Sequence, residues 1–270
     1  MDYCRDALQA LPQEWYALRS YCWIYGAVDL QMMGDLSGAH EWIEQGRRED
    51  IMVHGGPYAR NAAAEGFVAW IAADLAGLQR VGEFILGVSS DGAHWQSLGW
   101  AHYFMACVYY HRNDLENAFE HAQETFKRRY LNHALASVFS AFIMALVHQA
   151  KGEPEKAHEM EDLVANFAVE IRSTPFMLMV QSFQAELAVM QGRGRELIKW
   201  EERACVHVQL SAMPFFSPPP LTIPQVLLAI NTPPSRANAA DGRQRLSAFA
   251  TSTHTVRVMI EVLALNAMLQ

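Results

Sequence analysis

Residues Gly26–Ile43 have the sequence GAVDLQMMGDLSGAHEWI, in which an apolar segment ends at a Gly-Asp pair and a more polar segment follows. The same order recurs at Met105–Ala122 (MACVYYHRNDLENAFEHA) and at Met144–Glu161 (MALVHQAKGEPEKAHEME). Apolar residues return every three or four positions, which is typical of amphipathic helices. Each stretch therefore predicts two helices joined by a tight turn.

A small residue stands seven positions before each expected turn residue. The pairs are Ala27 with Gly34, Ala69 with Ala76, Ala106 with Asn113, Ala145 with Gly152, and Ala185 with Gly192. Gly or Asn at a turn permits the left-handed backbone that ends a helix, and a small residue lets the paired helix cross closely. The spacing predicts an all-α, right-handed superhelix of about six tetratricopeptide-like helix-turn-helix repeats, of about 40 residues each.

The proline-rich stretch Phe215–Pro234 (FFSPPPLTIPQVLLAINTPP) falls where a sixth first helix is expected, with the turn at Asn231. Thr222 is the expected N-cap and Pro224 lies in the opening turn, where a missing amide donor costs little. The closing prolines would stop this helix before a second one over Ser235–Ala250. A flexible linker is the alternative, which the apolar LTI and VLLAI segments disfavour.

The composition is that of a globular protein, with 51% apolar residues, 19% charged residues and a net charge of −8. The negative charge argues against direct contact of this segment with nucleic acid or anionic membranes. No secretory leader or long apolar run is found, and the four cysteines have no C-x-x-C spacing. We therefore expect one cytoplasmic domain over residues 1–270, without a membrane span. Both ends read as cut: Asp2–Leu11 resembles a second helix and His254–Gln270 a first helix, so a longer multidomain polypeptide is expected.

Two segments carry a resemblance to a known family. PPPLTIPQVLLA (Pro218–Ala229) followed by HTVRVMIEVLALNAMLQ (His254–Gln270) resembles the end of the helical sensor region of MalT-like, LuxR-type ATP-dependent transcription regulators. The opening Ala7–Ile43 is similar to the same family in its ALxxLP, LR and GDLxxA pattern.

The resemblance implies a nucleotide-binding module before this chain and an output module after it. That output is often a helix-turn-helix DNA-binding domain, although related regions also occur beside kinase or cyclase modules. No G-x-x-x-x-G-K-[ST] motif is present, so ATP and magnesium are assigned to the module outside this chain, and no cofactor is expected within it. In a member of the family, the corresponding region recognises an oligosaccharide inducer.

Two motifs superficially suggest a metal site. HEWIE (His40–Glu44) and HEMED (His158–Asp162) place histidine and acids one helical turn apart, but neither is H-E-x-x-H. Both lie on the polar second helices, where a solvated face is the simpler interpretation. No nucleophile motif is found, so neither a metal site nor an enzyme is expected.

The first helix of each pair is expected to line a concave groove. Its inward positions are Tyr21, Tyr25, Trp70, Trp100, Tyr103, Tyr110, His111, Phe139, Phe142, Gln149 and Glu186. Aromatic faces with a few hydrogen-bonding groups suit sugar rings or apolar small molecules. Aromatic residues at helical spacing can instead form the core between repeats.

Two functions follow from the expected groove. The first is an inducer sensor that binds a small molecule, such as a sugar or an aromatic compound, and contacts other domains of the same regulator. The alternative is a tetratricopeptide-repeat scaffold that binds a protein partner. Few lysines and arginines fall on the expected inner face, which favours the sensor.

Overall fold

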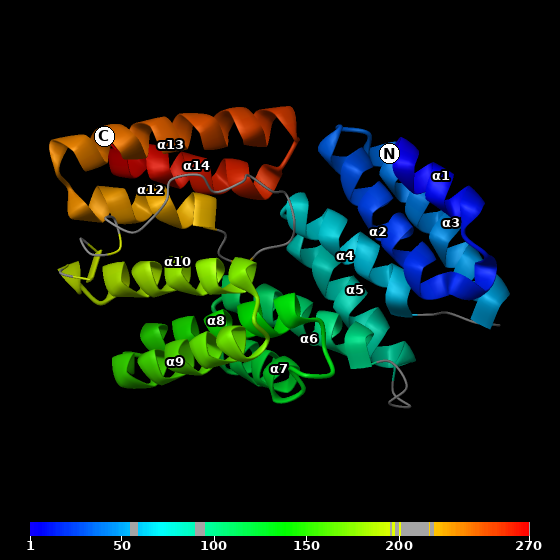
Figure 1. Cartoon of the computed structure of the whole chain (residues 1–270), viewed down its shortest axis with the longest axis horizontal. Helices are drawn as coiled ribbons and strands as arrows, with labels where there is room; N and C mark the ends of the chain where they lie inside the picture. The colour runs from blue at the N-terminus through cyan, green and yellow to red at the C-terminus, as the bar shows by residue number, and fades with distance from the viewer. Residues whose placement is uncertain are drawn as a thin grey trace.

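The computed structural model describes residues 1–54, 59–89, 95–194, 196–197, 200, 216 and 219–269 (Figure 1). Every regular element in this part of the chain is a helix, so the fold is all-α. In chain order the elements are α1 (Asp2–Ala10), the 3-10 helix η1 (Gln13–Trp15), α2 (Tyr16–Met32), α3 (Leu36–His54), α4 (Ala59–Ile71), α5 (Leu75–Val88), α6 (Trp95–His111), α7 (Leu115–Lys127), α8 (Ala134–Ala150), α9 (Pro154–Glu170), α10 (Thr174–Met190), α12 (Pro219–Ile230), α13 (Pro233–Ser252) and α14 (Val256–Leu269).

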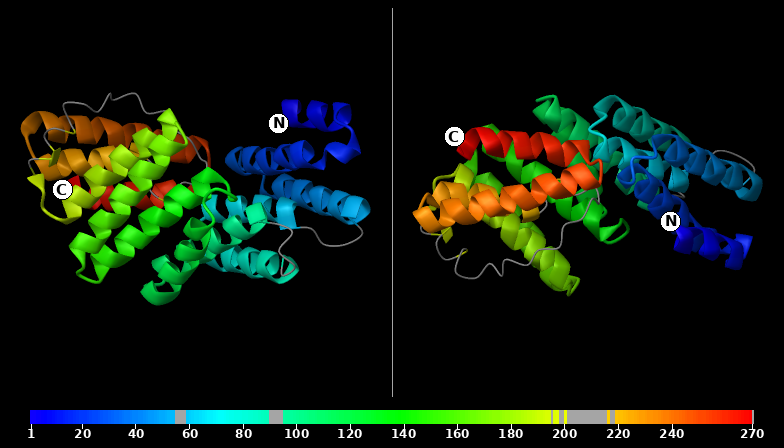
Figure 2. Two further views of the ribbon diagram at one scale, coloured as in Figure 1. Left: turned by 60° about the horizontal axis from the view of Figure 1, so that its bottom comes forward. Right: turned by 90° about the horizontal axis from the view of Figure 1, so that it is seen from above.

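Neighbouring helices pack as pairs, and the first helices of successive pairs also touch. The pairs are α2 with α3, α4 with α5, α6 with α7, α8 with α9 and α12 with α13. Contacts between first helices run from α2 to α4, α6, α8, α10 and α12 in turn. Figures 1 and 2 show α1–α3 at one end of the longest axis and α12–α14 toward the other. The last helix, α14, nevertheless contacts α4, so the C-terminal segment reaches back to the N-terminal half.

Each pair turns at a residue with left-handed backbone. These residues are Gly34, Ala73, Asn113, Gly152, Gly192 and Asn231, with φ of 80°, 58°, 60°, 73°, 67° and 57°. At the first five, the next N–H bonds back to the carbonyl five residues earlier, as in Asp35 N to Leu30 O at 2.9 Å. This bond satisfies a carbonyl that the end of the helix would leave without a partner. The sequence prediction is confirmed at five of the six turns.

The second turn was wrongly placed at Ala76, which lies inside α5. Ala73 is the left-handed residue because the Asp74 carboxylate caps α5 by accepting the Gly77 N–H at 2.8 Å. With this correction the turns lie 39, 40, 39, 40 and 39 residues apart. The small residue seven positions earlier is then Gly66 rather than Ala69, and a Cβ added there would overlap the Phe104 ring.

The proline-rich stretch forms more helix than the sequence predicts. Helix α12 begins at Pro219, so Thr222 lies inside it and is not its N-cap, and Pro224 is an interior residue. The prolines after Asn231 open α13, which Thr232 caps in a capping box with Ser235. Phe215, Ser217 and Pro218 lie outside the described residues.

A buried ion pair holds α1 against the first helix pair. Arg19 of α2 donates to both carboxylate oxygens of Glu49 of α3, from Nε at 2.7 Å and from Nη2 at 2.6 Å. Its Nη1 donates at 2.6 Å to the carbonyls of Leu8 and of Leu11, where α1 ends. One guanidinium therefore joins three helices.

We predict that Gly66→Ala lowers the free energy of unfolding by about 1–3 kcal/mol, because the added methyl group overpacks against Phe104. Gly87→Ala in α5 is the matched control, since no atom lies within 4 Å of its added Cβ. The control should gain about 0.5–1 kcal/mol from helix propensity. Urea unfolding followed by circular dichroism measures both, and equal effects of the two changes would contradict the close approach.

We also predict that Arg19→Ala destabilises the fold by about 3–5 kcal/mol, because it leaves Glu49 buried without its partner. Arg47→Ala removes a half-exposed arginine that pairs with Glu44 and Glu65, and should cost at most about 1 kcal/mol. Urea unfolding gives the free energy of unfolding of each variant, so that the cost of losing the buried ion pair can be compared with the cost of losing the surface ion pairs. A cost below about 1 kcal/mol for Arg19→Ala would contradict its joining role.

Candidate ligand-binding site

A pocket of about 130 Å³ lies where α2, α4, α6 and the start of α8 meet. We call it the aromatic pocket. Its lining residues are Ala17, Ser20, Tyr21, Ile24, Tyr25, Arg60, Ala63, Phe67, Gln96, Ser97, Trp100, His133 and Leu135.

Aromatic rings form the walls of this pocket. Tyr21 and Tyr25 lie one turn apart on α2, so their rings stack with centroids 6.4 Å apart, and the two residues are 42% and 45% exposed. Phe67 of α4 meets Trp100 of α6 edge to face at 4.8 Å, and Trp100 packs against His133 at 5.2 Å. The walls thus offer ring faces and edges from successive helices, which suits a flat apolar ligand.

Arg60 is the charged residue that lines the pocket. It stands on the same face of α4 as Ala63 and Phe67, at helical spacing. Its guanidinium lies 5.9 Å from the Tyr16 ring, and its Nε is buried without a hydrogen-bond partner. Among the described residues, no carboxylate comes within the 4.0 Å ion-pair distance of Arg60.

His133 adds a neutral donor to the pocket. It precedes α8, and its Nδ1 accepts the Leu135 N–H at 3.3 Å. Burial lowers the pKa of His133, so its imidazole is neutral near pH 7. Because Nδ1 accepts a hydrogen bond, the proton of this neutral ring is on Nε2, which can donate.

The predicted groove residues fall into separate groups. Tyr21, Tyr25 and Trp100 line the aromatic pocket together. Tyr103, Phe139 and Phe142 are 1%, 0% and 0% exposed, so they form the core between helices and not a groove surface. The alternative of core packing therefore applies to these three.

Trp70, Tyr110 and His111 form a second group, which residues from the C-terminal part cover. The ring of Phe216 lies 6.3 Å from Trp70, 5.3 Å from Tyr110 and 5.6 Å from His111. Arg257 of α14 lies 4.4 Å from the centre of the Trp70 ring and donates to the Phe216 carbonyl. These side chains are already engaged within the chain.

Gln149 and Glu186 connect successive helices. Gln191 donates to the Gln149 side chain at 2.8 Å, and Thr222 of α12 donates to Glu186 of α10 at 3.1 Å.

Two residues of the aromatic pocket, Arg60 and His133, were not predicted from the sequence. Arg60 could have been noticed as a single basic residue on an otherwise apolar helix face, whereas nothing local marks His133.

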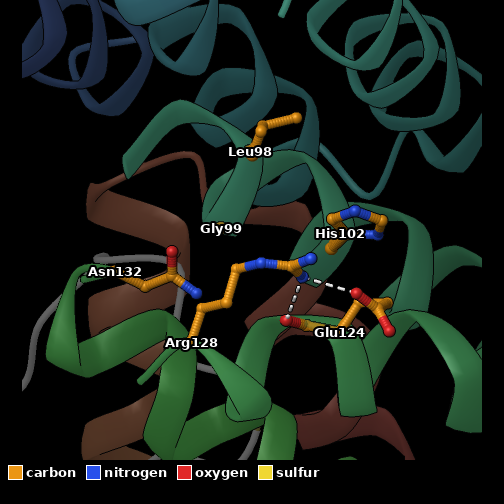
Figure 3. Close-up of a pocket in the computed structure, with 6 residues that line it drawn as sticks. All are labelled: Leu98, Gly99, His102, Glu124, Arg128 and Asn132. Carbon is orange, nitrogen blue, oxygen red and sulfur yellow. Dashed lines mark hydrogen bonds and ion pairs between the residues drawn. The ribbon is translucent and has the colours of Figure 1, made fainter. Parts of the chain in front are cut away.

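A second, smaller pocket of about 80 Å³ has mostly polar or charged residues in its lining (Figure 3). Leu98, Gly99, His102, Glu124, Arg128 and Asn132 line it. Arg128 already binds the Glu124 carboxylate, and the Nδ1 atoms of His102 and His121 are 2.9 Å apart. Burial lowers the pKa of His102 to about 4, which leaves that histidine neutral near pH 7. Because its charged groups are paired, this pocket is the weaker ligand site.

The two histidine motifs show no metal geometry. His40 Nδ1 contacts the Leu36 carbonyl at 2.7 Å, and His158 lies 3.2 Å from Glu161. Within the described residues, no three His, Cys, Asp or Glu side chains are grouped so that they could hold a metal ion.

None of the helices described here combines the length and apolar character needed to cross a membrane.

No family model, curated protein or solved structure matches this chain. Its function is therefore inferred from the pocket geometry together with the resemblance in sequence.

Asp50 of α3 is a buried acid near the charged side of the pocket. Its Oδ1 accepts from Asn61 Nδ2 at 2.8 Å, while Oδ2 is buried without a partner. Burial, with a smaller effect of Glu49, raises the pKa of Asp50 to about 7, against the opposing charge of Arg60. Since an aspartate in an unfolded chain titrates near pH 3.9, the native state binds more protons between about pH 4 and 7. Native stability from this group therefore falls as the pH rises through that range.

We predict that Asp50→Asn raises the melting temperature at about pH 8 and that this gain shrinks at about pH 5. The amide keeps an oxygen to accept from Asn61 and carries no charge. The exposed Asp241→Asn is the control, with a similar small effect at both pH values. Melting curves at the two pH values test this, and a pH-independent effect of Asp50→Asn would contradict the raised pKa.

Proposed function

We propose that this chain is the ligand-sensing helical-repeat domain of a MalT-like, LuxR-type ATP-dependent transcription regulator. In this proposal its helix pairs form a right-handed tetratricopeptide-like superhelix, which acts by binding and not by catalysis. The observation that carries the proposal is the aromatic pocket, with walls from α2, α4 and α6. The turn spacing of 39 or 40 residues supports the repeat architecture.

The pocket has the size for one ring. A cavity of about 150 Å³ lined by apolar side chains can hold benzene, and this pocket measures about 130 Å³. A ring held between Tyr21, Tyr25 and Trp100 would contact α2 and α6 at once. Such a ligand stabilises one arrangement of those helices over others, which is the requirement for a sensor.

The contact of α14 with α4 suggests a route for the signal. Arg60 and Phe67 line the pocket from α4, and Trp70 of the same helix lies under Arg257 of α14. A shift of α4 on ligand binding would therefore change the contact between Trp70 and Arg257 and so move α14. In the proposed regulator, the output module follows that helix.

A specific observation also favours the protein scaffold. Trp15, Leu18, Tyr21 and Tyr25 are all exposed large apolar side chains near the start of α2. An apolar group of this kind can receive a partner protein. The experiment below distinguishes this scaffold from the sensor.

We predict that a thermal-shift screen of sugars, aromatic acids and other ring metabolites finds compounds that stabilise the protein. The double variant Tyr21→Ala/Tyr25→Ala should bind such a compound at least about tenfold more weakly, because two stacking faces are lost. Both tyrosines are partly exposed and lie outside the buried core, so the variant should fold. Tyr3→Ala, which removes an exposed ring of α1 outside the pocket, should bind like the unchanged protein.

Calorimetric titration of the best compound gives the affinities. If no small molecule stabilises the protein, and a partner protein binds through Tyr21 and Tyr25, the sensor is wrong and the scaffold is supported. If the double variant and Tyr3→Ala bind a ligand equally well, the aromatic pocket is not the site.

A further inference from the structure

We propose that the ligand of the aromatic pocket is a small organic anion with a single ring, an aromatic carboxylate, and that Arg60 binds its carboxylate. This inference rests on the proposed ligand-sensing function and names the chemical class of the ligand.

Arg60 lines the pocket and has no ion pair with a carboxylate among the described residues. Three other arginines form direct ion pairs with a carboxylate: Arg19 with Glu49, Arg47 with Glu65, and Arg128 with Glu124. Arg60 instead has a cation–π contact with Tyr16 and a buried Nε without a partner. A buried donor that is left unsatisfied is costly, and a bound acceptor would remove that cost.

Asp50 is the acid whose charge acts on Arg60, but it lies outside ion-pair distance of the guanidinium. Burial also disfavours the charged form of the Asp50 carboxyl. A positive charge therefore remains at the pocket. The planar fork of a guanidinium matches the two oxygens of a carboxylate better than it matches a single hydroxyl.

The remaining lining sets the shape of the ligand. Phe67, Trp100 and the paired tyrosines would cover a flat apolar ring, and the volume of about 130 Å³ is close to that needed for one ring. The neutral His133 supplies one N–H donor for a further oxygen. A neutral sugar would leave Arg60 unpaired, so the pocket favours the anion.

Benzoate and its neutral isostere benzamide are the probes, titrated into the whole chain by calorimetry and by tryptophan fluorescence. We expect benzoate to bind at least about tenfold more tightly than benzamide, and its affinity to fall with added salt. Arg60→Gln should bind the two probes equally, while Arg60→Lys keeps part of the preference because it keeps the charge. Arg245→Gln, which removes an exposed positive charge on α13, is the control and should behave like the unchanged protein.

Equal binding of benzoate and benzamide by the unchanged protein would overturn the anion assignment, and so would a preference that survives in Arg60→Gln. Tighter binding of a neutral sugar than of benzoate would overturn it too, yet would leave ligand sensing intact. If no ring compound of any kind binds, the proposed function fails together with this inference.

Discussion

The left-handed residue between the two helices of a pair is the constraint on which the other features depend. Its positive φ reverses the chain within about three residues and, at five of the turns, lets the next N–H close a hydrogen bond to the carbonyl five positions back. The second helix must then return along the first. Because the reversal recurs every 39 or 40 residues, first helix follows first helix from α2 to α12.

This conformation has a cost where the residue is not glycine. A left-handed alanine is disfavoured by about 1–2 kcal/mol, as at Ala73, whereas asparagine, as at Asn113, tolerates this backbone better. The following aspartates offset part of this, since an N-cap contributes about 1 kcal/mol. Asp74 and Asp114 each accept an N–H from the first turn of the next helix. Turn and cap therefore act together as one local unit.

The packing of first helices creates both the core and the pocket. Deep between helices the aromatic side chains are enclosed, as where Phe142 and Phe183 stack at 4.0 Å. At α2 no earlier first helix covers Tyr21 and Tyr25 in the described chain, so their rings stay partly exposed and the pocket opens there. Farther along, Phe216 and Arg257 cover the corresponding surface.

The sequence by itself determined the all-α class, most of the turn positions and the placement of Tyr21 and Tyr25 on the same face of one helix. These depend on backbone preference and on spacing of a few residues, which are local properties. The second turn falls at Ala73, where the local Asp74 cap fixes the start of α5 and makes the turn spacing regular. Only the tertiary structure brought Arg60 and His133 to one pocket and Arg257 to Trp70. Such contacts join residues far apart in the chain, and their distances depend on how whole helices pack.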